Sequence, residues 1–408
     1  MNYKRRRASV IQRTKQRIFG MGKPDYSLLI IVVFLVIFGL IMVYDASVIG
    51  AAERYDDQFK FLKQQVVWVI LGSCFATLAY FFDYRQYPKI IVPAILSTIL
   101  LLGLVLIAGP VIFGSRRWFD LGTFRFQPSE LAKLTFTIYL ASWLSKQKVR
   151  SGKIKDDLKD HLKTELIPFA IIFILICALI IGEPDLGTTA IVAITALAVY
   201  FISGTDTIHT IGSFMLMGVM GVIGAFAAVI APYRLRRVQT FIETIQSGDV
   251  PDPLGAGYQI NQVLIAIGSG GLFGVGFGES RQKFFYLVGD SAWTDTIFAV
   301  FAEEFGFVGD VILMLVFLLF ISRGIQIALH APDRLGSLLA IGITVWIGIQ
   351  TFLNIAANIA LGPLTGIPLP FFSYGGSSMI VNLIAVGILL NISRFAKPSD
   401  TRATPFRR

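Results

Sequence analysis

Long apolar stretches, separated by short polar connections, dominate this chain. A stretch of about 18 or more apolar residues can cross roughly 30 Å of hydrocarbon as a helix. The pattern predicts ten spans, with boundaries good to a few residues, at 27–44, 63–82, 89–109, 129–145, 165–182, 187–203, 208–231, 295–321, 335–361 and 373–393. A transmembrane β-barrel is excluded, because its strands would show short alternating segments instead of continuous apolar runs. The predicted fold class is an all-α polytopic membrane protein.

The spans divide the chain into three regions. A basic segment, 1–26, is expected to stay in the cytoplasm, because the apolar run after it is too long for a removable signal peptide and lacks a cleavage pattern. The transmembrane domain covers 27–393, with its largest external loop at about 232–294 between spans seven and eight. Ten crossings return the tail, 394–408, to the cytoplasm. The lysine-rich connection at 146–163 falls on the same side, as expected for cytoplasmic loops.

Composition supports this assignment. The chain is 55% hydrophobic and only 15% charged, with a mean hydropathy of +0.70, which is too apolar for a soluble protein of this size. Its net charge of +10 is confined mostly to the termini and short connections, so it indicates membrane orientation and not nucleic-acid binding. Cys74 and Cys177 lie inside apolar runs and imply no disulfide.

Two predicted external loops carry positive charge against the orientation bias. The loop after the third span holds Arg116, Arg117 and Arg125, and the largest loop holds Arg234, Arg236, Arg237, Arg281 and Lys283. Arginine suits an anionic ligand, because its planar guanidinium grips phosphate oxygens in pairs. The alternative for any single arginine is that it reaches toward lipid headgroups. Two clusters that flank one acidic position favour an anionic ligand on the outer face.

The acidic position is Asp295, at the start of the eighth predicted span and after a glycine-rich stretch at 268–278. A carboxylate at the mouth of a membrane helix is costly unless it is used, so function is the leading hypothesis for it. The glycine-rich stretch contains GVGFG, but no βαβ unit can surround it, so a dinucleotide site is not expected. On the same helix, Glu304 is expected to bond a neighbouring helix, and Gly306 allows a bend.

Other charged residues lie near membrane depth. Glu130 and Lys133 are three residues apart on one helical face, where they can simply neutralise each other. Glu183 and Asp185 occupy a short external turn between two spans. The connection at 354–378 is rich in proline and glycine, and such irregular backbone is tolerated in a membrane only where protein or a wet cavity covers it. These features predict a cavity near the outer face.

Several motifs, in order, resemble the SEDS family, which comprises the RodA and FtsW type of cell-wall polymerases. They are FGSRRWFDLG, FQPSELAK, GEPDLGT, DPLGAGYQ, IAIGSGGLFG, GESRQK, TDTIFAVFAEEFGFVG and TGIPLPFFSYGGSS, and they extend over 113–378. The resemblance implies a peptidoglycan glycosyltransferase that joins lipid II units at the outer face of the bacterial cytoplasmic membrane. GESRQK and PFFSYGG favour the FtsW (division) branch and DPLGAGY the RodA (elongation) branch; on balance the division type is favoured.

The resemblance also implies roles for individual residues. Asp295 matches the essential aspartate of the family and would take the proton from the acceptor hydroxyl as general base. Trp293 and Thr296 depart from the family pattern, where His and Phe are usual, so no histidine is available for a role here. The candidate substrate-binding residues are Arg116, Arg117, Lys133, Glu183, Asp185, Arg234, Arg236, Arg281, Lys283 and Ser377. No dedicated metal site is visible, although a divalent cation, Mg²⁺ or Mn²⁺, could help stabilise a pyrophosphate.

The expected ligand is lipid II, and nucleic acid is not an expected partner. The resemblance further implies a class B penicillin-binding protein (a transpeptidase) and other membrane proteins of the divisome or elongasome as partners. The alternative function is a lipid-linked precursor flippase or another transporter, since ten spans around a polar cavity suit alternating access. A transporter would show polar residues on several broken helices and an internal repeat. Here the charges gather at one external mouth without a repeat, which favours the polymerase.

Overall fold

The structure, a computed structural model, describes most of the transmembrane domain. The described residues are 22–112, 114–120, 122, 124–147, 167–204, isolated positions between 211 and 221, 232–255, 257–284, 287 and 291–396. Helices account for nearly all regular structure in this part of the chain. The exception is a two-stranded antiparallel sheet in which β1 (Phe119–Asp120) pairs with β2 (Arg125–Phe126). The chain is a multi-pass helical membrane protein.

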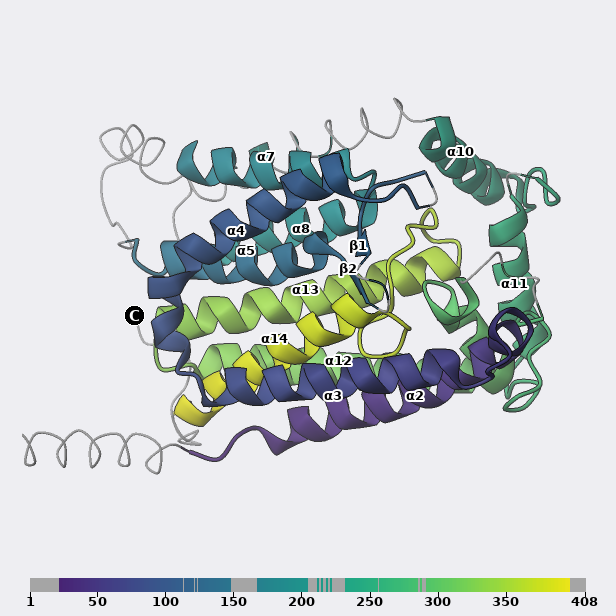
Figure 1. Ribbon diagram of the computed structural model, residues 1–408, viewed down its shortest axis with the longest axis horizontal. Helices are drawn as coiled ribbons and strands as arrows, with labels where there is room; N and C mark the ends of the chain where they lie inside the picture. Colours follow the sequence, from purple (N-terminus) through teal and green to yellow (C-terminus); the bar gives the residue numbers. More distant parts are fainter. Residues whose placement is uncertain are drawn as a thin grey trace, which may run out of the picture.

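Nine long helices of the described residues run side by side along the long axis of the molecule (Figure 1). They are α2 (Tyr26–Tyr55), α3 (Lys60–Phe81), α4 (Tyr87–Ala108), α5 (Pro128–Leu144), α7 (Ile167–Gly182), α8 (Leu186–Ser203), α12 (Ile297–His330), α13 (Arg334–Asn358) and α14 (Gly376–Phe395). Seven of them are long and apolar enough to cross a membrane. These nine helices overlap nine of the ten predicted spans, although α2 and α12 continue well past the predicted ends at 44 and 321. The remaining one, 208–231, falls largely outside the described residues.

The first helix is longer than the sequence suggested. The predicted span stops at Tyr44, because Asp45 interrupts the apolar run, yet α2 continues to Tyr55. Asp45 is buried, and its carboxylate lies 2.8 Å from the ammonium group of Lys283. A neutralising partner that is distant in sequence therefore allows the helix to continue past a charge that local hydropathy treats as an end.

Helix α14 lies in the middle of the bundle and packs closely against α3. Gly387 faces the backbone of Ala76, and a Cβ atom at position 387 would collide with the Ala76 carbonyl oxygen. Since a clash with backbone cannot be relieved by turning a side chain, glycine is required at this crossing. Small residues at such contacts are the usual means of bringing membrane helices close together.

Both ends of the described chain lie at the same end of the bundle. The Gly22 amide donates to the carbonyl oxygen of Arg394 at 2.9 Å, and the Asp25 amide donates to the Ser393 hydroxyl at 3.0 Å. The start of α2 and the end of α14 are thereby joined. This arrangement is the one that an even number of crossings requires, and the count of ten stays a prediction because 208–231 falls largely outside the described residues.

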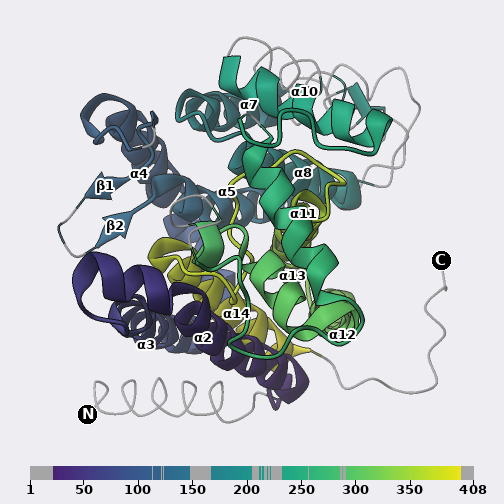
Figure 2. The same ribbon diagram turned by 90° about the vertical axis from the view of Figure 1, so that its right-hand side faces the viewer.

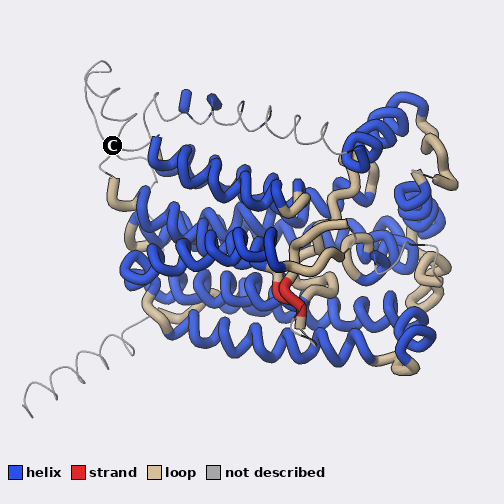
Figure 3. Tube along the Cα trace, turned by 45° about the horizontal axis from the view of Figure 1, so that its top comes forward, coloured by secondary structure: helices blue, strands red, loops and turns tan. Residues whose placement is uncertain are grey.

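The opposite end of the bundle holds most of the irregular structure. The short strands, α10 (Pro232–Ser247) and α11 (Tyr258–Gly270) gather there, as Figure 2 shows. Figure 3 shows that long loop segments collect toward the same end. Helix α11 buries Val263 and Ala266 and packs against α12. The predicted external loop is thus a folded cap that stands on the ends of the membrane helices.

Helix α12 is interrupted at Gly306, which has φ 65° and ψ −170°. The loop between α11 and α12 supplies the backbone partners that the break leaves open. The amides of Val275 and Gly276 donate to the carbonyls of Glu303 and Glu304, at 3.0 and 3.1 Å. Below the break, the Phe307 and Val308 amides donate to loop carbonyls at 2.9 and 3.1 Å. The bend predicted at Gly306 is confirmed, and the upper segment of α12 is joined to the loop.

Candidate active site

Asp295 lies at the loop-rich end, between the 3-10 turn η3 (Ser291–Trp293) and the first residue of α12. The Ser291 carbonyl accepts from the amides of Thr294 and Thr296, at 3.1 and 3.0 Å, which closes a tight turn around the aspartate. The Thr294 hydroxyl donates to Asp295 Oδ1 at 3.0 Å. The side chain of Asp295 is half-buried. The carboxylate is therefore displayed at the end of the bundle and is not enclosed in its core.

Two amides of α13 hold the backbone of Asp295. Asn354 Nδ2 donates to the Asp295 carbonyl oxygen at 2.8 Å, and Asn358 Nδ2 donates to the same oxygen at 3.1 Å. Asn354 Nδ2 also donates to the carbonyl of Ile367 at 2.8 Å. Because asparagines four residues apart share one face of a helix, α13 fixes the position of the aspartate. Neither residue was predicted from the sequence, although their four-residue spacing could have indicated them.

The electrostatic setting of Asp295 suits proton transfer. Burial among protein atoms raises the pKa of the Asp295 carboxyl, and this effect outweighs the Thr294 hydrogen bond and the positive charge of Arg237, which lower it. A raised pKa brings a carboxylate closer to the value needed for a general base near neutral pH. The side chain is partly covered by protein and still reached by solvent.

Arg237 is the arginine that the structure brings into electrostatic range of Asp295. It belongs to α10, and its guanidinium donates to the Leu364 carbonyl at 2.9 Å. Arg237 and the neighbouring Arg236 are both exposed. The side chain of Arg234 lies outside the described residues. Since residues 237, 240, 241 and 244 share one face of α10, helical spacing could have distinguished Arg237 from its neighbours.

Arg237 lines an open cleft between α10, α11 and the connection after α13, with about 420 Å³ of empty volume when the adjoining open solvent is included. Its lining combines polar and apolar side chains: Arg237, Thr240, Phe241, Thr244, Gln259, Ile260, Ala360, Gly362, Pro363 and Leu364. A cleft with one cation, several hydroxyl or amide groups and apolar walls has the character of a small-molecule site. A cleft is thus present at the loop-rich end of the bundle, where the sequence predicted a cavity, and Arg237 connects it electrostatically to Asp295.

A second group of predicted residues meets at the turn between α7 and α8. Arg117 Nε donates to the Glu183 carbonyl at 2.9 Å, and the same guanidinium donates to the Pro184 carbonyl. Asp185 caps α8 by accepting from the Thr188 amide at 2.9 Å and from its hydroxyl at 2.8 Å. Arg117 and Asp185 therefore stabilise the turn through contacts within the protein.

Glu183 is fully buried in this turn. No donor in the described parts of the chain makes a hydrogen bond of normal geometry with its carboxylate oxygens. Burial, followed by the nearby charge of Asp185, raises the pKa of Glu183 to about 9, although the Ser129 hydroxyl and Arg117 act to lower it. Glu183 is consequently neutral at physiological pH.

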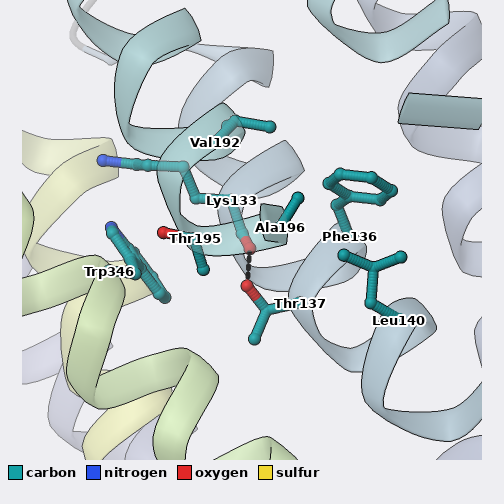
Figure 4. Close-up of a pocket in the computed structure, with 8 residues that line it drawn as sticks. All are labelled: Lys133, Phe136, Thr137, Leu140, Val192, Thr195, Ala196 and Trp346. Carbon is teal, nitrogen blue, oxygen red and sulfur yellow. Dashed lines mark hydrogen bonds between the residues drawn. The ribbon is translucent and has the colours of Figure 1, made fainter. Parts of the chain in front are cut away.

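Lys133 lies deeper, on α5, in a buried polar cluster. Its ammonium group is 2.8 Å from Glu130 Oε2 and 2.7 Å from Gln350 Oε1, so the expected mutual neutralisation of the pair is confirmed. Trp346 Nε1 also donates to Gln350 Oε1, at 3.1 Å. Figure 4 shows the small adjoining cavity, with the Lys133 amine and the Trp346 indole nitrogen on the same side of it.

Lys283 belongs to a separate cluster that clamps the loop before α12. Its ammonium group donates to Asp45 Oδ1 at 2.8 Å, to the Gly278 carbonyl at 2.6 Å and to Glu304 Oε1 at 3.2 Å. Glu304 thus has the structural role that was expected, but its lysine partner comes from a loop and not from a neighbouring helix. Arg281, two residues earlier, is exposed.

Arg116 and Ser377 complete the set of candidates. A terminal nitrogen of Arg116 donates to the Ile107 carbonyl at 2.5 Å, at the end of α4. The Ser377 hydroxyl accepts from the Gln127 amide at 3.0 Å and donates to the Arg125 carbonyl at 3.2 Å. Ser377 therefore joins the start of α14 to the strand that leads into α5. Substrate binding by these two residues stays a prediction.

The structure thus separates the candidates by what they contact. Arg237 lines the cleft and acts electrostatically on Asp295, whereas Arg117, Asp185, Lys133 and Lys283 bond partners within the protein. In the part of the chain that the structure describes, no group of three or more His, Cys, Asp or Glu residues could hold a metal ion. The arrangement provides one accessible base beside one cation, which is suited to removing a proton next to an anionic group.

Comparison with known proteins places this geometry in context. A family model of cell cycle proteins, covering FtsW, RodA and SpoVE, matches residues 26–398. Stage V sporulation protein E of Bacillus subtilis (strain 168) is 40% identical over 378 residues, which cover 92% of this chain and 98% of that protein. The "Probable peptidoglycan glycosyltransferase FtsW" of Geobacter sp. (strain M18) is 38% identical over 372 residues, 90% of this chain and 96% of that protein.

Solved structures are similar over the same extent. A chain from a study of structural coordination of polymerization and crosslinking by a peptidoglycan synthase complex superposes with a TM-score of 0.71, at 30% identity, over 91% of this chain and 98% of its own length. The rod shape-determining protein RodA of Thermus thermophilus superposes with a TM-score of 0.63, at 28% identity, over 92% and 98% of the two chains. Sequence and fold therefore agree over almost the whole molecule.

Proposed function

Because this chain belongs to the FtsW, RodA and SpoVE family of cell cycle proteins, we propose that it is a peptidoglycan glycosyltransferase that polymerises lipid II. The relatives named as peptidoglycan glycosyltransferases support this activity. The observation that carries the proposal for the site is the position of Asp295. It is a half-buried carboxylate with a raised pKa, and it lies within the electrostatic influence of Arg237, which lines a cleft.

The reaction joins the 4-hydroxyl of an acceptor sugar to the anomeric carbon of a lipid-linked donor. Asp295 accepts the hydroxyl proton while the oxygen attacks that carbon, so the new glycosidic bond forms as the bond to the pyrophosphate oxygen breaks. The lipid pyrophosphate leaves with the bonding electron pair. Such general base catalysis contributes roughly 10² to 10⁴ in rate.

Arg237 is the described residue best placed to hold the pyrophosphate. Its guanidinium lies in the cleft and influences the Asp295 carboxyl electrostatically. Hydrogen bonds to phosphate are stronger when the donor is charged, and they act on the charge that grows on the leaving group. A divalent cation, Mg²⁺ or Mn²⁺, bound through the pyrophosphate itself belongs to the proposal only as an added counter-charge. No step depends on it.

The membrane setting follows from the same reaction. We place the protein in the bacterial cytoplasmic membrane with the loop-rich end outside and both termini in the cytoplasm, in agreement with the basic 146–163 connection. The lipid tail of the substrate would then lie against the apolar helix surfaces below the cleft. A chain with this fold comes from a peptidoglycan synthase complex that couples polymerization with crosslinking, and this supports a class B penicillin-binding protein as partner. Other divisome or elongasome membrane proteins complete the proposed assembly.

The division branch is the better assignment within the family. The sporulation and FtsW relatives are 40% and 38% identical, whereas the RodA structure is 28% identical. No feature of the site favours the flippase alternative. The branch is tested by expressing this chain in a strain that lacks the division polymerase. Restored growth would support the division branch. Rescue of rod shape instead would assign the chain to the elongation branch.

The decisive experiment measures glycan polymerisation by the purified full-length protein, with its transpeptidase partner, on lipid II. Asp295→Asn removes the base but keeps the size of the side chain and its bond to Thr294. We expect polymer formation to fall by roughly 10² to 10⁴, with lipid II binding retained. Asp57→Asn is the matched control, because Asp57 is an exposed aspartate between α2 and α3 that pairs with Lys63. A fully active, folded Asp295→Asn protein would refute the assignment.

A further inference from the structure

One face of α13 carries polar side chains at a constant four-residue spacing: Trp346, Gln350, Asn354 and Asn358. All four are buried. Gln350 Nε2 donates to the Pro368 carbonyl at 2.9 Å, and Asn354 Nδ2 donates to the Ile367 carbonyl at 2.8 Å. Polar side chains in membrane helices normally bond partners on other segments. This face of α13 therefore holds the irregular 365–369 segment.

The upper two members of this face reach Asp295. Their Nδ2 atoms are 2.8 Å (Asn354) and 3.1 Å (Asn358) from its carbonyl oxygen. Asp295 precedes the first residue of α12, so the regular hydrogen bonds of that helix do not by themselves fix its backbone. The direction of a side chain follows from the backbone that bears it. The two donors on α13 consequently help to determine where the Asp295 carboxylate points.

The remaining polar atoms of these asparagines show that packing alone does not explain them. Both Oδ1 atoms are buried and accept no hydrogen bond from the described residues. A buried acceptor without a donor destabilises a fold, and an apolar residue of the same size would avoid that cost. Asn382 on α14 also has an unpartnered Oδ1, and the Asn358 amide also donates to the Asn354 carbonyl of its own helix at 2.9 Å. What sets Asn354 and Asn358 apart is that both donate to the backbone of one half-buried aspartate.

We propose that Asn354 and Asn358 are positioning residues for Asp295, which hold its backbone so that the carboxylate meets the acceptor hydroxyl. This inference rests on the proposed function, because it takes Asp295 as the base. A misplacement of about 1 Å at a reacting group can cost on the order of 10²-fold in rate. Loss of a positioning residue should thus lower kcat, while the cleft that binds the substrate stays intact.

The test compares Asn354→Leu and Asn358→Leu with Asn382→Leu. Leucine removes the amide but keeps a similar size. Asn382 is the matched control: it is buried on α14, it also has an unpartnered Oδ1, and its amide donates only to the Ser378 hydroxyl of the same helix, at 3.3 Å. We expect kcat for polymerisation to fall roughly 10-fold to 100-fold in the two α13 variants, with KM for lipid II within about twofold. The control should keep its kcat.

Three results would overturn the proposal. They are an unchanged kcat in folded α13 variants, a rise in KM with kcat intact, and an equal loss in Asn382→Leu. If a leucine variant does not fold, Asn354→Ser or Asn358→Ser replaces it. A helical serine hydroxyl bonds a carbonyl of its own helix and therefore cannot hold Asp295. Asn358→Gln keeps the amide and should recover part of the lost kcat.

Combination with Asp295→Asn separates this inference from the proposed function. If Asp295 is the base and Asn358 acts through it, Asn358→Leu should cause no further loss when Asp295 is already asparagine. A purely structural loss would multiply in the double variant. If Asp295→Asn alone is fully active, the proposed function fails. If Asp295→Asn is inactive but both leucine variants are as active as the unchanged protein, only the positioning inference fails.

Discussion

Asp295 and Glu183 are two acidic residues at the same end of the bundle, and both have a raised pKa. Glu183 is fully enclosed and lacks a hydrogen-bond donor among the described residues. Asp295 is reached by solvent, bonded by Thr294 and influenced by Arg237. Burial alone therefore does not identify a catalytic acid. Each acid has an arginine nearby, Arg237 for Asp295 and Arg117 for Glu183. Access to solvent is what distinguishes the acid that can act on a substrate from the acid that is enclosed in a turn.

The largest expected contrast comes from moving the Asp295 carboxylate without removing it. Asp295→Glu keeps the acid but lengthens the side chain by one methylene, which displaces the carboxylate by roughly 1 Å. We expect the rate of polymerisation to fall by on the order of 10²-fold. This loss is smaller than the upper end of the range expected for Asp295→Asn. Turnover of lipid II by the purified complex measures both. Equal activity of the Glu variant and the unchanged protein would show that the position of this acid is not critical.

A large effect on stability is expected at the internal clamp, which contrasts with the cleft. Lys283→Met leaves Asp45 and Glu304 buried without their cation, and breaking a buried ion pair costs about 3–5 kcal/mol. The side chains of all three residues are less than a tenth exposed, so solvent does not screen the loss. Thermal unfolding in detergent should show a clearly lower midpoint. An unchanged midpoint would mean that the clamp contributes little to the fold.

Glu183 should make the stability of the folded protein depend on pH. Its pKa in the folded protein is about 9, above the ordinary value of 4.5, so the folded state binds this proton more tightly than the unfolded state does. The associated stability is fully present below about pH 4.5 and is lost as the pH rises toward 9. Glu183→Gln stays neutral at every pH. Unfolding midpoints measured from pH 5 to 9 should therefore decline less in the Gln variant, and parallel declines would contradict the assignment.

Replacement of Arg237 should have a smaller effect, which tests the role of the cation near Asp295. Arg237→Ala removes a charged donor from the cleft, and a hydrogen bond of this kind is worth about 1.5–3 kcal/mol. We expect lipid II affinity to fall by roughly 10-fold to 100-fold, whereas Arg236→Ala, at an exposed position outside the cleft lining, should have less effect. Because Arg237 lowers the pKa of Asp295, its loss should also move the acid limb of the pH–rate profile upward.

The smallest effect is expected at Asp57. Lys63 is the main cause that lowers the pKa of this exposed aspartate, through a hydrogen bond at 2.9 Å. Exposed ion pairs contribute little to stability. Asp57→Asn should thus change neither the unfolding midpoint nor the rate of polymerisation. A marked loss of either would mean that a perturbed pKa marks importance even at a solvated surface.

The sequence predicted much of the fold because membrane spans depend on contiguous residues. Nine described helices lie where apolar runs placed them, and the Glu130–Lys133 pair follows from a three-residue spacing within one helix. Asp295 was also identifiable, since a carboxylate at the start of an apolar helix stands out locally. The end of α2 was not predictable, because the partner that neutralises Asp45 is more than 200 residues away in the chain.

The sequence by itself determined where the helices lie, which end of them carries the charges, and which acid is the best candidate for catalysis. Each of these is a property of neighbouring residues. Only the tertiary structure decided that Arg237 lines the cleft and that Lys283 pairs with two buried acids. It also decided that Asn354 and Asn358 hold the backbone of Asp295. These contacts join segments that are distant in the chain, and they form only because the packing of helices brings those segments within hydrogen-bond distance.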